Sequence, residues 1–140
     1  MNRRQEREEA FFMLFENEFA PDKDISEIYE NAKEARKVEE SAYVRTVLCG
    51  VRANKTELDR MIDRHSHGWK RERISAVAGA VMLLAAYEML YMPEVPVRVS
   101  LNEAIELIKK YGEDKARPFV NGVLNAISED EAVLAVRGDA

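Results

Sequence analysis

The sequence predicts an all-α fold of about six or seven helices in a single domain. Apolar residues recur at steps of three and four along almost every segment, which is the spacing of one face of a helix. No stretch of the sequence shows the sustained alternation of a half-buried strand. The chain has 140 residues, of which 46% are hydrophobic and 34% charged, as expected for one globular domain with one core.

The N-terminal half contains three predicted helical segments. The first helix covers about residues 3–18, and its inward side carries the apolar residues Ala10, Met13, Leu14 and Phe15. Pro21 in "FAPDKD" ends this helix, because proline lacks an amide hydrogen and clashes inside a helix. A short polar helix follows around residues 25–36. An apolar stripe then covers residues 41–62, with a break where Thr56 can cap a new helix.

The most apolar run of the chain is "AVAGAVMLLAAYEMLYM", at residues 76–92. It is shorter than the roughly 20 residues that a membrane span needs, and Glu88 interrupts it. We therefore expect no membrane segment here. The run instead predicts a fully buried central helix over about residues 74–90.

Two more helices are predicted in the C-terminal third. Ser100 is expected to cap "LNEAIELIKKYG", which Gly112 terminates. Pro118 suits the first turn of the last helix, "RPFVNGVLNAI". The only strand-like hints are "PEVPVRVS" and "AVLAV", both too short for a sheet. About residues 131–140 are expected to form a C-terminal tail, which is frayed at "RGDA".

Asn121 and Gly122 are unusual choices in an amphipathic helix, and both are predicted to have structural tasks. The short side chain of Asn121 could satisfy free backbone donors near the helix start. Gly122 would let a neighbouring helix approach closely.

Charge and cysteine content restrict the function. The formal net charge of −5 argues against general coating of nucleic acid, so any such binding would have to be local. The single cysteine excludes an internal disulfide framework and fits a reducing compartment, and the chain has no secretory signal, so we expect a cytoplasmic protein. Cys49 lies among apolar residues and is expected to be a buried, inert thiol.

The sequence offers no constellation for catalysis, a metal or a cofactor. His65 and His67 are two residues apart, so on one helix they would point about 200° apart and could not share an ion. There is no glycine-rich phosphate loop, and no nucleophile stands near a matching base. We therefore expect a protein that is not an enzyme.

Two basic groups are the more informative feature. Arg3 and Arg7 are four residues apart on one face of the first helix, which we expect to be exposed, with Arg4 on its flank. A second group, Lys109, Lys110, Lys115 and Arg117, brackets the Gly112 loop ahead of Phe119. Cations beside an aromatic ring suit single-stranded RNA, because they bind phosphates while the ring stacks on a base. The alternatives are a solvated helix face for the arginines and a core position for Phe119.

The order of motifs resembles the NusB family of transcription antitermination factors nearly from end to end. The resemblance begins with "RRQEREEAFFMLFE" and continues through "WKRERI" and "AAYEML". Its most specific part is "PVRVSLNEAIELIKKYG" followed by "RPFVNGVLNAI". It implies an all-helical fold of two packed sub-bundles and no catalysis. It also implies that the protein binds the boxA element of nascent RNA with ribosomal protein NusE, in an antitermination complex with RNA polymerase.

The resemblance also assigns site residues. Those implied for RNA are Arg3, Arg4, Arg7, Phe15, Asp114, Lys115, Arg117 and Phe119. The partner face would lie on the central helix and include Ala78, Val81, Met82, Tyr87 and Glu88.

Departures from the family pattern keep a second hypothesis open. Ala78 and Gly79 stand where the family usually has a charged pair, and Leu83 stands where it has an arginine. Acids also dilute the N-terminal arginines. The alternative function is therefore a helical interaction module with weakened or lost RNA binding. The apolar central helix could also serve a homodimer, although we expect it to be buried within one chain. An enzyme related to fused RNA methyltransferases is disfavoured, because 140 residues leave no room for a catalytic domain.

Overall fold

The computed structural model describes residues 1–66 and 74–138, and these residues form helices without strands. The eight helices are α1 (Arg3–Phe19), α2 (Ile25–Arg36), α3 (Ala42–Ala53), α4 (Lys55–Arg64), α5 (Ala76–Tyr91), α6 (Val97–Tyr111), α7 (Ala116–Ser128) and α8 (Glu131–Val136). The predicted all-α fold is confirmed.

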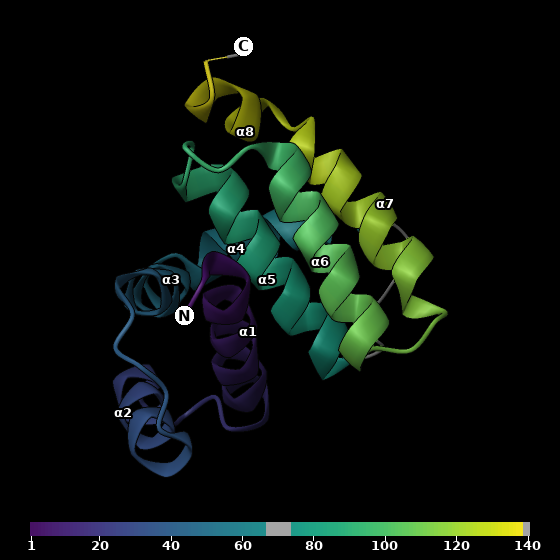
Figure 1. Ribbon diagram of the computed structural model, residues 1–140. Coiled ribbons are helices and arrows are strands. Elements are labelled where there is room, and N and C mark those ends of the chain that lie inside the picture. Colours follow the sequence, from purple (N-terminus) through teal and green to yellow (C-terminus); the bar gives the residue numbers. More distant parts are fainter. Residues whose placement is uncertain (67–73, 139–140) are drawn as a thin grey trace.

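Helix α5 lies between two groups of helices (Figure 1). On one side it packs against α1 and α3, and α2 packs against both of these helices. On the other side it packs against α4, α6, α7 and α8. These groups correspond to the two expected sub-bundles, and α5 belongs to the core of both.

The composition of α5 explains its central place. From Ala80 to Leu90 every residue is buried, so the helix has no polar face to turn toward water. A helix that is apolar all round is stable only when other elements cover every side. The expectation that this helix is buried within one chain is confirmed. Glu88 is the one charged residue in this stretch, and its side chain is 1% exposed.

Two C-terminal expectations were wrong. Helix α6 begins at Val97 with Pro96 as its N-cap, so the second half of "PEVPVRVS" is helical and Ser100 lies inside the helix rather than capping it. Proline suits this position because it has no amide hydrogen to leave unpaired. The segment expected to be a C-terminal tail contains α8, which ends just before "RGDA" and in which Val133 is fully buried. Only residues 139–140 of that tail lie outside the described residues.

Arg137, just after α8, binds the C-terminal end of α5 and the turn that follows. Its guanidinium donates to the carbonyls of Met89 at 3.1 Å, Glu88 at 3.1 Å and Met92 at 3.3 Å. It also donates to the turn carbonyls of Val95 and Pro93, at 2.5 and 3.3 Å. The last carbonyls of a helix are short of donors within it, and Arg137 supplies one to Met89. The Glu88 and Met92 carbonyls also accept from the backbone N–H groups of Met92 and Val95.

Gly122 does not allow a close helix contact. It is exposed, and a Cβ built on it would meet nothing within 4 Å. Asn121 is also exposed and lies in the second turn of α7, whose N-cap, Lys115, makes no side-chain cap hydrogen bond. The close approach occurs instead at Gly50 in α3, where a Cβ would overlap the ring of Tyr87.

Replacing Gly50 with alanine should lower the free energy of unfolding by about 1–2 kcal/mol, because the Tyr87 ring would have to move and repack. The ring is 6% exposed and packs on Tyr91 at a centroid distance of 5.2 Å, so it has little room. Chemical denaturation would measure the change. Gly122→Ala is the matched control, and it should raise stability by up to about 1 kcal/mol, because alanine favours a helix. Equal stability of the two variants would contradict the close contact.

Candidate nucleic-acid interface

The N-terminus of α1 is held by a reciprocal cap. The Asn2 side chain accepts from the backbone N–H of Gln5 at 2.8 Å, and the Gln5 side chain accepts from the Asn2 N–H at 2.9 Å. This capping box fixes the first turn, which carries Arg3 and Arg4. Both arginines reach solvent, and their side chains are 52% and 74% exposed.

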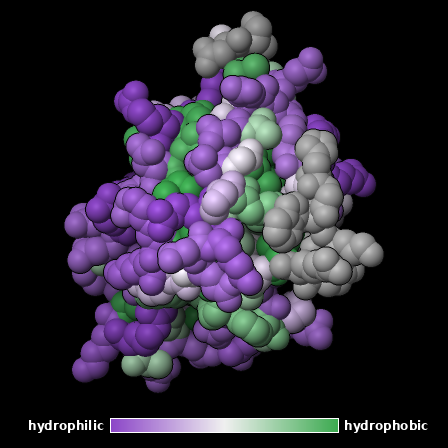
Figure 2. All heavy atoms as spheres, turned by 90° about the vertical axis from the view of Figure 1, so that its right-hand side faces the viewer, coloured by the Kyte–Doolittle hydropathy of each residue, from purple (hydrophilic) through white to green (hydrophobic). Residues whose placement is uncertain are grey.

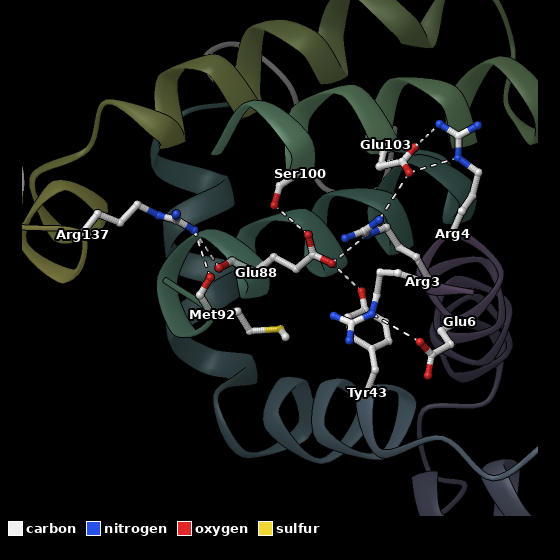
Figure 3. A network of polar contacts seen from close by, with 10 residues as sticks. Arg3, Arg4, Glu6, Tyr43, Glu88, Met92, Ser100, Glu103 and Arg137 are labelled. Carbon is white, nitrogen blue, oxygen red and sulfur yellow. Dashed lines mark hydrogen bonds and ion pairs between the residues drawn. The ribbon is translucent and has the colours of Figure 1, made fainter. Parts of the chain in front are cut away.

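Arg7 does not share that exposure, although the sequence predicted an exposed face. Its side chain is 6% exposed and turns inward, where Nε donates to Oε2 of Glu88 at 2.8 Å. Glu88 also accepts from the hydroxyls of Tyr43 and of Ser100, the latter at 2.6 Å (Figure 3). Side chains from α1, α3, α5 and α6 therefore meet at one buried carboxylate.

The electrostatics of this cluster follow from burial and pairing. Burial by itself would lower the pKa of Arg7, but the hydrogen bond to Glu88 and its charge raise that pKa above its ordinary value. Burial raises the pKa of Tyr43, and the negative charge of Glu88 raises it further. Arg7 thus stays charged, Tyr43 stays neutral, and each donates to the same acceptor.

A groove of about 320 Å³ lies between α1 and α6, and it brings Arg4 and Arg7 of the first basic group together with Lys109 and Lys110 of the second. Arg4 donates from Nε and Nη2 to the two oxygens of Glu103, at 3.1 and 3.0 Å. Lys110 donates to Glu8 at 2.8 Å, and so does the hydroxyl of Tyr111, also at 2.8 Å. The cations predicted from sequence are therefore paired with acids that the sequence analysis did not single out.

These pairs shift the pKa values of their members. The hydrogen bond to Glu103 and its charge raise the pKa of Arg4. The hydrogen bond between Lys110 and Glu8 raises the pKa of Lys110. Partial burial by itself would raise the pKa of Glu8, but the hydrogen bonds from Lys110 and Tyr111 lower it below its ordinary value. Arg4, Glu8 and Lys110 are thus held in their ionised forms.

Phe15 on α1 and Phe119 on α7 are both half-buried and pack against the core. Phe15 packs edge-on against Phe19, at a centroid distance of 5.0 Å, beside a shallow hollow on α1. Phe19 is 70% exposed and escaped the sequence analysis, although its place four residues after Phe15 on one helix face was a usable signal. Phe119 faces Ala78 and Ser75 across a smaller hollow of about 220 Å³.

The loop between α6 and α7 carries Asp114 and Lys115, and the first turn of α7 carries Arg117. Lys115 and Asp114 are almost fully exposed, and Arg117 lies 3.6 Å from Asp114 between Nη2 and Oδ1. Nε of Arg117 is shielded from solvent without a hydrogen-bond partner among the described residues. The side of the molecule on which α7 lies in Figure 1 is mainly hydrophilic, with apolar patches between polar side chains (Figure 2).

Comparison with known proteins places the chain in a family. The model of the NusB family matches residues 4–129. This chain belongs to the NusB family. It is 42% identical over 130 residues to the transcription antitermination protein NusB of Bacillus licheniformis, covering 93% of this chain and 98% of the relative. It is 43% identical over 130 residues to that of Bacillus subtilis, covering 93% and 97%.

The fold agrees with a solved NusB structure. The structure of T. maritima NusB superposes with a TM-score of 0.82 at 33% sequence identity, and the match covers 94% of each chain. The resemblance noted in the sequence is therefore confirmed, both in family and in fold.

The partner face expected of a NusB-family chain is not at the surface here. All five predicted residues are at most 6% exposed: Ala78, Val81, Met82, Tyr87 and Glu88. They form core contacts because neighbouring helices cover α5 on every side. A partner could reach α5 only beside them, for example at Tyr91, which is 40% exposed.

Other candidate groups give no additional centre. Cys49 was expected to be buried but is exposed, since its helix α3 turns it outward between buried Leu48 and half-buried Gly50. His65 lies 2.8 Å from Asp130, between Nε2 and Oδ2, whereas His67 lies outside the described residues. Over residues 1–66 and 74–138 no three His, Cys, Asp or Glu side chains are grouped to hold a metal ion, and no helix is long and apolar enough to cross a membrane.

Proposed function

We propose that this NusB-family protein binds the boxA element of nascent RNA together with ribosomal protein NusE. It would act in this way within an antitermination complex on RNA polymerase, without catalysis of its own. Membership of the family and the transcription antitermination role of its relatives support the proposal. The single observation that carries it is the α1–α6 groove, where Arg4 and Lys110 lie at one surface and Lys110 lies over the ring of Tyr111.

The predicted RNA-site residues that lie at or near the surface have different tasks in this proposal. Arg3, Arg4 and Lys115 would bind RNA phosphates, because their side chains reach solvent. The half-buried rings of Phe15 and Phe119 would offer an edge or part of a face to a base. Asp114 and Arg117 would shape the loop between them.

Arg7 takes a different task from the one that the family resemblance implies. Its guanidinium is committed to Glu88 and lies inside the protein. We propose that it anchors α1 on α5 and so positions Arg3 and Arg4, rather than contacting RNA. A phosphate could reach the Arg7 guanidinium only if α1 moved away from α5.

Binding should be weak without NusE. Few phosphates can be neutralised by so small a basic surface, and the net charge of −5 repels RNA at long range. A bound partner would add phosphate contacts and hold the α6–α7 loop before RNA arrives. The second candidate function, an interaction module without RNA binding, is favoured by the acids that pair with Arg4 and Lys110.

A titration of labelled boxA RNA decides between the two functions. We expect wild type with NusE to bind boxA RNA more tightly than a scrambled RNA, and Arg4→Glu to weaken boxA binding about tenfold with a salt slope smaller by about 0.7. Arg60→Glu makes the same charge change at an exposed side chain of α4 and should alter affinity less than twofold, or about 0.4 kcal/mol. Equal binding of boxA and scrambled RNA, with no effect of Arg4→Glu, would favour the interaction module.

A further inference from the structure

Glu103 occupies the side of Arg4 that a phosphate would use. Its two carboxylate oxygens accept from Nε and Nη2 of Arg4 at 3.1 and 3.0 Å, as one parallel pair of bonds (Figure 3). The Glu103 side chain is 14% exposed, whereas Arg4 is 74% exposed. The acid is therefore fixed in the groove, and the arginine is the exposed member of the pair.

Carboxylate and phosphate compete for the same guanidinium geometry. Both present two oxygens to the planar fork of N–H donors, and both bind it through two charge-assisted hydrogen bonds. A phosphate that engages the Nε side of Arg4 must first displace Glu103.

Glu103 can release Arg4 without becoming an unpaired buried charge. It also accepts from Nη1 of Arg7 at 3.4 Å, and Arg7 is fixed by Glu88. The Arg4 end of the pair faces solvent, where an ion pair contributes little and salt screens it. Arg7 thus keeps the carboxylate beside Arg4, where it competes with a single phosphate, and the weak pairing with Arg4 yields to RNA held at several points.

We propose that Glu103 acts as an internal phosphate mimic that keeps Arg4 from binding RNA indiscriminately. RNA that makes other contacts to the protein or its partner displaces the carboxylate, and RNA that touches Arg4 alone does not. This inference rests on the proposed RNA-binding function and adds a residue that controls its selectivity.

The test compares four variants with wild type in titrations with labelled boxA RNA and with a scrambled RNA of equal length. Glu103→Gln should tighten binding of both RNAs about fivefold, and of the scrambled RNA more, so that discrimination falls. Glu106→Gln is the matched control: it removes the same charge from the same helix and groove, but its partner is Lys109 at 3.5 Å. It should change affinity less than about twofold.

Glu103→Asp separates competition from net charge. It keeps the charge but shortens the side chain, so it should free Arg4 and also tighten binding. Adding Arg4→Gln to Glu103→Gln should abolish the gain. Unchanged or weaker binding by both Glu103 variants, each checked for a folded state by thermal unfolding, would overturn the inference, since a purely structural acid would weaken the site when removed.

The outcomes separate this inference from the proposed function. If wild type with NusE prefers boxA RNA but neither Glu103 variant binds more tightly, the inference fails alone. If neither wild type nor the Glu103 variants bind RNA, both fail. If wild type binds RNA poorly and Glu103→Gln binds it well, Glu103 is confirmed as the residue that keeps Arg4 from binding RNA.

Discussion

Glu88→Gln is expected to lower the free energy of unfolding by about 3–5 kcal/mol, because it leaves the Arg7 guanidinium buried without its counter-charge. The amide has nearly the shape of the carboxylate, so packing is kept and charge is the main change. Glu103 contacts Arg7 at 3.4 Å and offsets part of the loss, which places the result toward the lower end of that range. Urea denaturation followed by circular dichroism would measure it.

A double-mutant cycle tests whether the pairing of Arg7 with Glu88 is responsible. Arg7→Met alone should also destabilise strongly, because it leaves a buried carboxylate with only the Tyr43 and Ser100 hydroxyls as donors. The Arg7→Met, Glu88→Gln double variant should be more stable than the sum of the single effects predicts, by about 1–3 kcal/mol. Strictly additive effects would show that the two side chains do not depend on each other.

Arg137→Ala is expected to lower the free energy of unfolding by about 2–3 kcal/mol, because five backbone carbonyls lose their common donor at once. Hydrogen exchange should accelerate in α8, which loses its main polar connection to α5, while α1 stays protected. Arg98→Ala is the control, since Arg98 is an exposed arginine on α6 and its loss should change stability by less than about 0.5 kcal/mol.

Arg137→Lys refines this test. A lysine keeps the charge but has a single nitrogen, which cannot reach carbonyls on both α5 and the following turn as a planar guanidinium does. We expect it to restore less than half of the lost stability. Full restoration would mean that charge near the end of α5, and not the set of hydrogen bonds, stabilises this region.

Sequence periodicity predicted most of the fold because it reports which face of each helix is apolar. The central helix was clear from the sequence, since a run apolar on all sides has only one stable environment. Ser100 was misread as a cap because serine is common at helix starts, and nothing local shows that its hydroxyl has a buried acceptor on another helix. The helix at residues 131–136 was missed because six residues are too few for a periodic pattern.

The candidate site was predicted in residue type but not in pairing. Arg3, Arg4 and Arg7 look alike in sequence, and only the packing of α1 on α5 turns Arg7 inward to Glu88. On α6 the positions of Glu103 and Lys110, seven residues apart, did place them on one helix face. That they meet Arg4 and Glu8 depends on how α1 and α6 are aligned, which no local pattern encodes.

The contacts of α1 also determine the order in which the protein can assemble during synthesis. Arg7 and its partner Glu88 are 81 residues apart, and Arg4 and Glu103 are 99 residues apart. A ribosome adding about 5–20 residues per second needs roughly 4–16 s to make the shorter of these separations. Throughout that interval the first helix has only α2 and α3 to cover it, so its phenylalanine-rich face must wait for α5 and α6 to emerge. The nascent N-terminal half is therefore the stage at which this chain most needs protection from aggregation.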